Sequence, residues 1–222
     1  MPRAWYETDD PQLEERQLEA ARSGDLAAFN WLVLRYQTRV YSLCYRMLSD
    51  PDAAADATQE AFLSAWRAMP HFKGEHFRTW LLRIATNGCL DVIRSRKRRP
   101  TQSLDNWNPG DSSEEAEPLP ITDLDPSVDP EGQALRAETV AAIQLGLDNL
   151  PEDQRTVLIL VDVQGLSYEE AASVTGANLG TVKSRVNRAR ARMRDFLSER
   201  GVLPSRRGEQ PSHAQRSISN ET

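Results

Sequence analysis

The chain has 222 residues, 39% of them hydrophobic, and a formal net charge of −6 at pH 7. This length suits one or two compact domains, and the hydrophobic share is sufficient for real cores. No apolar run is long enough to span a membrane, and the N-terminus lacks the apolar segment of a signal peptide, so we expect a cytoplasmic protein.

The N-terminal half is predicted to be helical throughout. Apolar residues from position 29 to position 47 step by three and four, which indicates one long amphipathic helix. Asp50 or Asp52 is expected to cap a second helix, which Pro70 ends. A loop at 71–76 then leads into a third helix that begins near Phe77. This third helix runs into the basic segment at 94–99.

The overall acidic charge argues against nucleic acid, but the charge is unevenly distributed. Residues 100–135 hold nine acidic side chains, six prolines and no Lys or Arg. Such a stretch cannot build a core and is typical of an extended or disordered linker. We therefore expect an N-terminal domain over 1–99, an acidic linker over 100–132, a second domain over 133–200 and a disordered tail over 201–222.

Residues 165–192 are predicted to form two short helices around a tight turn. Ser167 and Glu170 have the spacing of a capping box, and Gly176 can end the first helix with a positive φ. Asn178 is the expected N-cap of the second helix. The segment 183–194 then carries six Lys or Arg and no acidic residue. A helix-turn-helix needs one buried side and one side for the DNA major groove, and this segment has both.

Several motifs resemble those of one known family. The segments DATQEAFLSAW at 56–66, FKGE at 72–75, FRTWLLRIATN at 77–87 and DVIR at 91–94 resemble sigma-factor region 2. The segment LPEDQR at 150–155, followed by the helix-turn-helix, resembles region 4. The pair, without a third domain between, is similar to the extracytoplasmic-function group of bacterial sigma-70 factors, the sigma-24 or RpoE-like factors. The resemblance implies an all-α fold of two helical domains joined by a flexible acidic linker.

The resemblance also implies a function. Such a protein binds core RNA polymerase, recognises the minus-35 and minus-10 promoter elements, and promotes melting of the DNA. The docking surface for the clamp of the polymerase's largest subunit would consist of Asp56, Gln59 and Glu60. On composition alone, the same face is an ordinary solvated helix surface. The family context favours docking.

The minus-10 element would be contacted by the loop after the second helix and by the polar stripe of the third. The implied residues are Phe72, Lys73, His76, Arg83, Asn87, Arg94, Arg96, Lys97 and Arg98. A captured, unstacked base needs a stacking surface, which is worth about 1–3 kcal/mol per base. Phe72 either supplies that surface or belongs to the core, and the sequence leaves both open. Asp91 is expected to pair with a nearby arginine, because phosphates repel it.

The minus-35 element would be contacted by the second helix of the helix-turn-helix. The implied residues are Thr181, Lys183, Ser184, Asn187, Arg188 and Arg192. Val182, Val186, Ala189 and Met193 form the apolar face of the same helix and are expected to pack inward. Other arginines, such as Arg185 and Arg190, are assigned to phosphates or to packing by their stems.

The implied partners are core RNA polymerase (the clamp and the flap of the second-largest subunit), promoter DNA and an anti-sigma factor, with no direct membrane contact. We expect no cofactor, no metal and no enzymatic activity, since no phosphate loop or nucleophile motif is present. Cys44 and Cys89 lie in apolar helical patterns and are expected to be buried, reduced thiols.

Two alternatives from other classes are a ligand-sensing helix-turn-helix regulator and a nucleic-acid-processing enzyme. Binding to isolated core polymerase separates a sigma factor from the regulator. Dependence on a metal or nucleotide would favour the enzyme.

Overall fold

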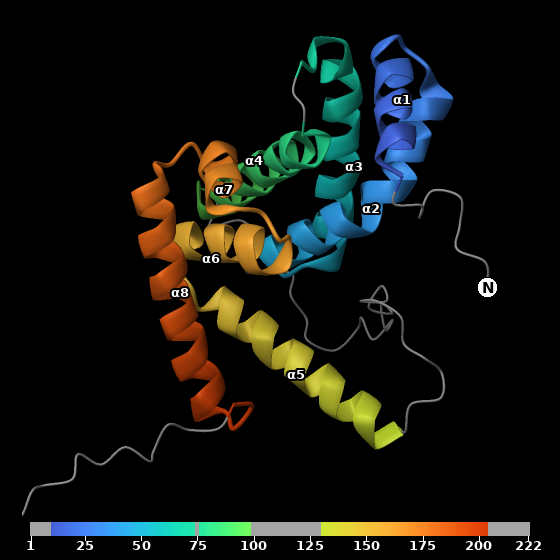
Figure 1. Ribbon diagram of the computed structural model, residues 1–222. Coiled ribbons are helices and arrows are strands. Elements are labelled where there is room, and N and C mark those ends of the chain that lie inside the picture. Colours follow the sequence, from blue (N-terminus) through green and yellow to red (C-terminus); the bar gives the residue numbers. More distant parts are fainter. Residues whose placement is uncertain (1–9, 74–75, 99–129, 204–222) are drawn as a thin grey trace, which may run out of the picture.

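The computed structural model describes residues 10–73, 76–98 and 130–203. Within these ranges the chain forms eight α-helices and no strand, which confirms the predicted all-α fold. Figure 1 shows two groups of helices. Helices α1 to α4 form what we call the N-terminal domain, and α5 to α8 form the C-terminal domain.

The N-terminal domain is built around its longest helix, α2, which packs against α1, α3 and α4. Its elements are α1 (Pro11–Arg22), α2 (Leu26–Leu48), α3 (Pro51–Ala68), the 3₁₀ turn η1 (Met69–His71) and α4 (Phe77–Arg98). The apolar stripe predicted for α2 lies in the core, where Leu32, Val40 and Leu43 are 0% exposed. The predicted helices of this half are therefore confirmed.

Aspartates begin the first three helices. Asp10, Asp25 and Asp50 each accept a hydrogen bond from a first-turn backbone N–H, which is otherwise without a partner in its helix. The cap predicted at Asp50 is confirmed. Helix α1 was not predicted as a separate element. The pair Asp10-Pro11 is its sequence signal, because proline is favoured in the first turn after an aspartate cap.

The C-terminal domain consists of α5 (Pro130–Asp148), α6 (Glu152–Leu158), the π-helical turn η2 (Ile159–Val163), α7 (Tyr168–Thr175) and α8 (Leu179–Glu199). Helices α7 and α8 are the predicted helix-turn-helix. Ser167 and Glu170 form the predicted capping box, and Gly176 ends α7 with a φ of 67°. The side chain of Asn178 accepts from the Thr181 N–H at 2.8 Å, so the expected cap of α8 is also confirmed.

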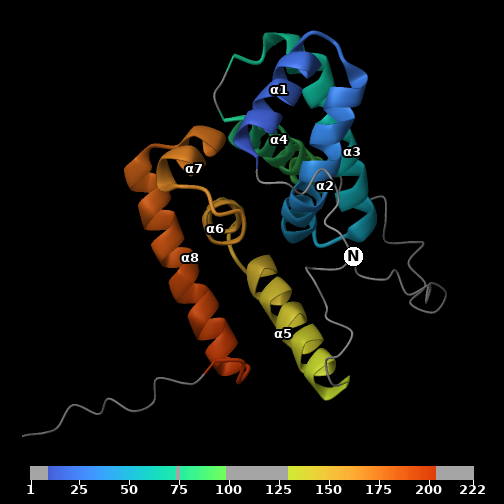
Figure 2. The ribbon, with the colours of Figure 1, turned by 45° about the vertical axis from the view of Figure 1, so that its right-hand side comes forward.

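The two domains touch. Helix α7 lies against α4, and α2 contacts both α5 and η2. Figures 1 and 2, two views turned by 45°, both show α7 beside α4 and α8 on the outer side of the molecule.

The predicted linker and tail lie almost entirely outside the described residues. Helix α5 already begins at Pro130, inside the segment expected to be linker up to 132. Proline fits the first position of a helix, since no backbone N–H is needed there. The remaining domain boundaries stay predictions.

Candidate nucleic-acid interface

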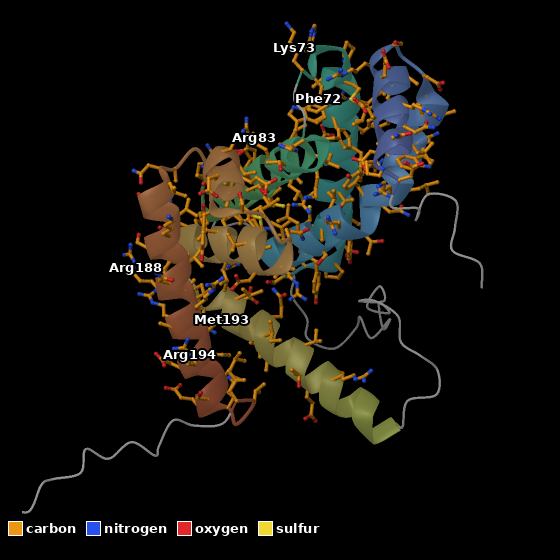
Figure 3. All side chains as sticks on the ribbon, viewed as in Figure 1. Phe72, Lys73, Arg83, Arg188, Met193 and Arg194 are labelled. Carbon is orange, nitrogen blue, oxygen red and sulfur yellow. The ribbon has the colours of Figure 1, made fainter. Side chains whose placement is uncertain are left out.

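Helix α8 divides cleanly into a buried and an exposed side. Val182, Val186 and Ala189 are 0% exposed, and Met193 packs against the same core. The opposite side exposes Lys183, Asn187, Arg188 and Arg192. Figure 3 shows Arg188 pointing away from the rest of the molecule, on the outer face of α8. The structure therefore leaves four of the six residues predicted for minus-35 DNA accessible.

The other two residues, Thr181 and Ser184, are half-buried and support the first turns of α8. The Ser184 hydroxyl donates to the Thr181 carbonyl at 2.9 Å. Arg188 in turn donates from Nη2 to the Ser184 hydroxyl at 3.0 Å and from Nε to the Ser184 carbonyl at 3.2 Å. Ser184 thus orients the Arg188 guanidinium within its own helix.

Two further arginines hold α8 in place. The Arg185 guanidinium pairs with Asp153 of α6 at 2.8 Å. Arg190 donates from Nε to Asp162 of η2 at 2.9 Å. The hydrogen bond with Asp162 raises the pKa of Arg190 further above its ordinary value. The structure shows ion pairs within the C-terminal domain for both arginines, and the two roles expected for them, phosphate contact or packing by their stems, stay predictions.

The polar stripe of α4 is exposed, but several of its cations have protein partners. Arg94 pairs with Asp91 at 3.1 Å, so the partner expected for Asp91 is confirmed. Arg96 pairs at 2.8 Å with Asp50, the cap of α3. The Ala53 N–H, with help from Arg96, lowers the pKa of that carboxyl below its ordinary value. Asn87 and Arg98 are exposed.

The remaining two cations of this stripe contact the C-terminal domain. Arg83 donates to the Ser173 hydroxyl of α7. Lys97 pairs with Glu152 of α6 at 2.6 Å. Sequence reasoning did not foresee these contacts, because it treated the domains as separated by the linker.

Phe72 is a core residue in this structure. It is 5% exposed, with ring centroids 4.7 Å from Trp80 and 5.8 Å from Phe77. The Arg22 guanidinium lies 5.1 Å from the centre of the Phe72 ring, a cation–π arrangement. Phe72 was expected either to stack on a base or to belong to the core. Its burial favours the core role, since an aromatic ring packed on three sides offers no face to a base.

The neighbours of Phe72 on the loop are accessible. Lys73 and His76 are exposed, and the two residues between them lie outside the described ranges. Figure 3 shows Lys73 at the outer end of the N-terminal domain.

The predicted docking surface lies on α3. Asp56, Gln59 and Glu60 are all exposed. Glu60 forms an ion pair with Arg67, whose Nη1 lies 3.3 Å from Oε1 of Glu60. Leu63 is 42% exposed, at helical spacing from Gln59 and Glu60. Sequence reasoning missed it, although a leucine within a polar stripe is a recognisable signal for a contact surface.

The cysteines are buried, free thiols, as expected. A hydrogen bond with Cys44, together with burial, raises the pKa of the Cys89 thiol. Among the described residues, no group of three or more His, Cys, Asp or Glu side chains is arranged to hold a metal ion. None of the described helices has both the length and the apolar character needed to cross a membrane.

A helix-turn-helix with an exposed basic face, joined to a second helical domain with its own basic stripe, defines a two-domain DNA-binding protein. Comparison with known proteins narrows this class. Residues 32–99 match the family model for sigma-70 region 2, and residues 141–193 match the model for sigma-70 region 4.

Curated relatives point to one group within that family. The RNA polymerase sigma-H factor of Pseudomonas aeruginosa is 40% identical over 185 residues, which cover 81% of this chain and 91% of the relative. The ECF RNA polymerase sigma-E factor of Escherichia coli K12 is 37% identical over 187 residues, covering 81% and 92%. The ECF factor SigE of Mycolicibacterium smegmatis is 35% identical over 198 residues, covering 88% and 72%.

Two solved structures share the fold. CnrH, in complex with the cytosolic domain of CnrY, is 25% identical with a TM-score of 0.61, covering 84% of this chain and 98% of CnrH. RpoE of Bartonella quintana, in complex with the anti-sigma factor NepR, is 28% identical with a TM-score of 0.59, covering 77% and 96%.

The chain belongs to the extracytoplasmic-function group of the sigma-70 family. It is a transcription initiation factor that binds core RNA polymerase, recognises minus-35 and minus-10 promoter elements and promotes DNA melting. Like the rest of its family it is not an enzyme, since the polymerase carries out the chemistry.

Proposed function

We propose that the two domains of this sigma factor divide promoter recognition between α8 and the α4 region, while α3 docks on the polymerase. The observation that carries the proposal is the division of α8 into a buried apolar side and an exposed basic side. In a helix-turn-helix, the second helix is held on one side by the rest of its domain and enters the major groove with the other side. The helices α5, α6 and α7 supply that support.

At the minus-35 element, Arg188 reads bases and Lys183, Asn187 and Arg192 contact bases or phosphates. The planar guanidinium can bond a guanine edge at two points. The two hydrogen bonds from Arg188 to Ser184 reduce the side-chain freedom lost on binding. Ser184 is thus a positioning residue, and Thr181 lies in the first turn, where backbone N–H groups attract a phosphate.

At the minus-10 element, Lys73 and His76 contact the captured base, and the α4 residues contact the strand. These are Arg83, Asn87, Arg94, Arg96, Lys97 and Arg98. Because the Phe72 ring packs against Trp80 and Phe77, we assign it the role of holding the loop rather than stacking on a base.

Core polymerase binds α3 through Asp56, Gln59 and Glu60, which contact the clamp of the largest subunit. Leu63 supplies apolar area at the centre of the same face. The C-terminal domain binds the flap of the second-largest subunit.

An anti-sigma factor is the further partner that we propose. The similar RpoE was solved with the anti-sigma factor NepR. We place the protein in the cytoplasm, where the bacterial polymerase acts.

Run-off transcription tests the whole proposal. Core polymerase alone and core with this protein are compared on a promoter selected from a randomised library by the holoenzyme. The expected result is a specific transcript with the protein and none with core alone. Equal transcripts in both reactions would refute the proposal.

A further inference from the structure

The two cysteines of the chain lie side by side in the core of the N-terminal domain. Cys44 is on the buried side of α2 and Cys89 is on the buried side of α4, and both are 0% exposed. Their side chains share a hydrogen bond, so the two sulfur atoms are in contact where α2 and α4 pack together. Neither cysteine is among the residues assigned to DNA or to core polymerase, so a role for this pair is separate from promoter recognition.

The pair lies at the edge of the core rather than at its centre. Cys89 is the last buried residue of α4, and the residues after it, up to Arg98, are half-buried or exposed. Cys44 contacts the hydroxyl of Thr58 on α3, and Thr58 is itself only half-buried. Cys44 therefore lies directly beneath a side chain that water reaches.

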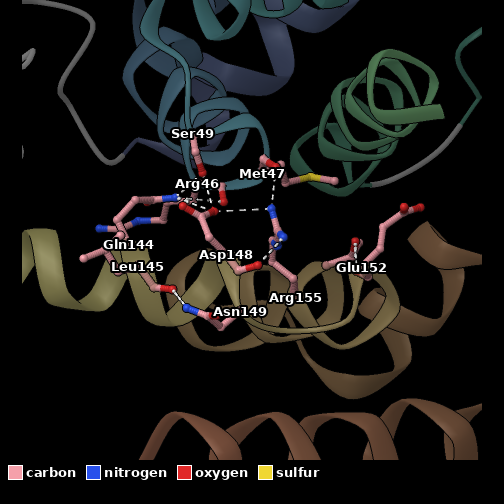
Figure 4. A network of polar contacts seen from close by, with 10 residues as sticks. Arg46, Met47, Ser49, Gln144, Leu145, Asp148, Asn149, Glu152 and Arg155 are labelled. Carbon is pink, nitrogen blue, oxygen red and sulfur yellow. Dashed lines mark hydrogen bonds and ion pairs between the residues drawn. The ribbon is translucent and has the colours of Figure 1, made fainter. Parts of the chain in front are cut away.

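The two helices that carry the cysteines differ in how firmly their ends are held. Figure 4 shows the end of α2, where Arg155 of α6 donates from Nη1 to the Met47 carbonyl at 3.1 Å. A guanidinium at a helix C-terminus is favourable, since the last carbonyls have no partner within the helix. The end of α4 is held by ion pairs between exposed groups, such as Arg96 with Asp50, which contribute little each. Local opening of the last turns of α4 is therefore the easier route by which a small oxidant reaches the sulfur atoms.

The two thiols differ in how readily they ionise. The hydrogen bond with Cys89, together with the Thr58 hydroxyl, lowers the pKa of the Cys44 thiol, although burial acts in the opposite direction. The same hydrogen bond, together with burial, raises the pKa of the Cys89 thiol. The thiolate, and not the thiol, attacks an oxidant. Cys44 is therefore the nucleophile of the pair, and Cys89 keeps its proton.

An unpaired hydroxyl lies close to the pair along α4. Thr86, one turn before Cys89 on the same buried face, is 0% exposed. Among the described residues, its hydroxyl is one of the buried polar groups without a hydrogen-bond partner. A buried donor without a partner costs free energy, and an oxygen added to a neighbouring sulfur atom gives such a donor an acceptor.

We propose that Cys44 and Cys89 are a peroxide-reactive pair that closes to a disulfide between α2 and α4. The Cys44 thiolate attacks an oxygen of a hydroperoxide, so that an S–O bond forms, the O–O bond breaks and the leaving oxygen takes up a proton. The Cys89 sulfur then attacks the Cys44 sulfur of this sulfenic acid: the S–S bond forms, the S–O bond breaks, and water leaves with the proton of Cys89. The two thiols together lose two electrons, which reduce the hydroperoxide to water or to an alcohol and water.

Contact between the two sulfur atoms has two consequences. A disulfide bond of about 2.05 Å needs only a small approach of α2 and α4, so the core can accept it. Cys89 also intercepts the sulfenic acid before it is oxidised further to sulfinic or sulfonic acid, which a thiol reductant does not reverse. The closed loop contains all of α3, and such a crosslink stabilises a domain by restricting its unfolded chain.

Hydrogen peroxide added to the reduced, folded full chain tests the proposal, followed by blocking of the remaining thiols and peptide mass mapping. Masses are read on the peptides that contain the cysteines, since methionine also takes up oxygen. We expect Cys44 and Cys89 to be joined in one peptide pair that is lighter by two hydrogen atoms, and dithiothreitol to restore both thiols. In Cys89→Ser, Cys44 should instead gain oxygen atoms, whereas in Cys44→Ser, Cys89 should stay reduced at the same dose. Alanine replaces serine at either position if a buried serine weakens the fold.

Thermal unfolding followed by tryptophan fluorescence gives an independent readout. We expect the oxidised native chain to melt about 5 °C or more above the reduced chain, and Cys89→Ser treated in the same way to show no such rise. Thiols that stay reduced in the folded chain but oxidise once urea unfolds it would overturn the proposal. Sulfinic acid at Cys44 of the native chain in place of the disulfide, or a disulfide that joins two chains, would overturn it as well.

Discussion

Helices α4 and α8 both carry cations beside an apolar face, yet their charges meet different partners. On α8, Arg188 bonds Ser184 one turn earlier and keeps its outer surface exposed. On α4, Arg83 and Lys97 bond residues of the other domain. An amphipathic sequence therefore decides which side of a helix is polar. Whether that side is open to DNA depends on what the rest of the chain places against it.

The largest change in unfolding free energy is expected from a substitution in the core beneath α4. Phe77 is 2% exposed and packs edge-on against Tyr36 at 5.5 Å. We expect Phe77→Ala to destabilise the N-terminal domain by about 3–5 kcal/mol, because it leaves a cavity. Urea unfolding followed by tryptophan fluorescence measures this, since the described tryptophans, Trp31, Trp66 and Trp80, all lie in that domain. A loss below about 1 kcal/mol would contradict the packing described.

The open face of α8 is tested by Lys183→Ala and Arg188→Ala, made separately. A base contact should cost about 1–3 kcal/mol and relax the preference at one position. A phosphate contact should weaken all sequences equally and reduce the salt slope by about one unit. Because Arg188 is oriented by Ser184, we expect it to behave as the base reader.

The measurement is holoenzyme affinity for single-base variants of the minus-35 element at two salt concentrations. Arg94→Ala, on α4, is the control, which should leave minus-35 preference unchanged. If both α8 variants leave the affinities for the base variants and their ranking unaltered, Lys183 and Arg188 do not read the minus-35 element.

The polar face of α3 should contribute to binding of core polymerase independently of the DNA-contacting faces of α4 and α8. We expect Gln59→Ala with Glu60→Ala to weaken core binding by about 1–2 kcal/mol, in the range of moderate interface residues. The fold should survive, since both side chains are exposed. Titration of labelled protein with core polymerase measures the change, with Glu19→Ala on α1 as a matched exposed control. Equal affinities for all three proteins would remove this face from the docking surface.

The ion pair between Arg96 and Asp50 gives α4 a smaller, pH-dependent contribution. The pKa of Asp50 is lowered in the folded state, chiefly by the Ala53 N–H and also by Arg96. Its stabilisation is therefore present above the unfolded pKa of about 3.9 and is lost as pH falls through the folded value. The Asp50 side chain is 40% exposed, so we expect less than about 1 kcal/mol after solvent screening.

Asp50→Asn keeps a capping oxygen but removes the charge. The difference in unfolding free energy between the two proteins should be largest near pH 7 and vanish below the folded pKa. A difference that is constant with pH would exclude the carboxylate charge as its cause.

The smallest effect is expected where α5 supports α8. A Cβ on Gly146 would lie 2.9 Å from Sδ and Cε of Met193 and 3.1 Å from the Phe196 ring. The flexible end of Met193 can move, and alanine gains about 1 kcal/mol of helix propensity. We expect Gly146→Ala to change stability by less than about 0.5 kcal/mol, whereas Gly146→Val should overpack the contact and cost about 1–3 kcal/mol. Thermal unfolding followed by circular dichroism distinguishes the two, and equal melting temperatures would argue against a close α5–α8 approach.

Local sequence was sufficient for α2, α3, α4, α7 and α8 and for several of their ends, but not for α1 or for the start of α5. Asp50, Ser167, Gly176 and Asn178 act through hydrogen bonds or backbone angles within a few residues, so their roles could be predicted from spacing. The same is true of the inward face of α8, because helical periodicity alone brings Val182 and Val186 to one side. The docking and DNA-contact assignments stay predictions that follow from family motifs on these helices.

Tertiary structure determined the contacts between residues far apart in the sequence, which residue spacing could not predict. Phe72 has neighbours from α1 and α4, and its burial depends on where those helices cross. Likewise, Arg83 and Lys97 find their partners about 90 and 55 positions further along the chain. The sequence by itself determined which residues are polar, apolar or capping, because those properties act over one or two helical turns. The packing of one domain on the other determined which cations of α4 bond the C-terminal domain, because Coulomb and hydrogen-bond contacts depend on distance in space and not on distance along the chain.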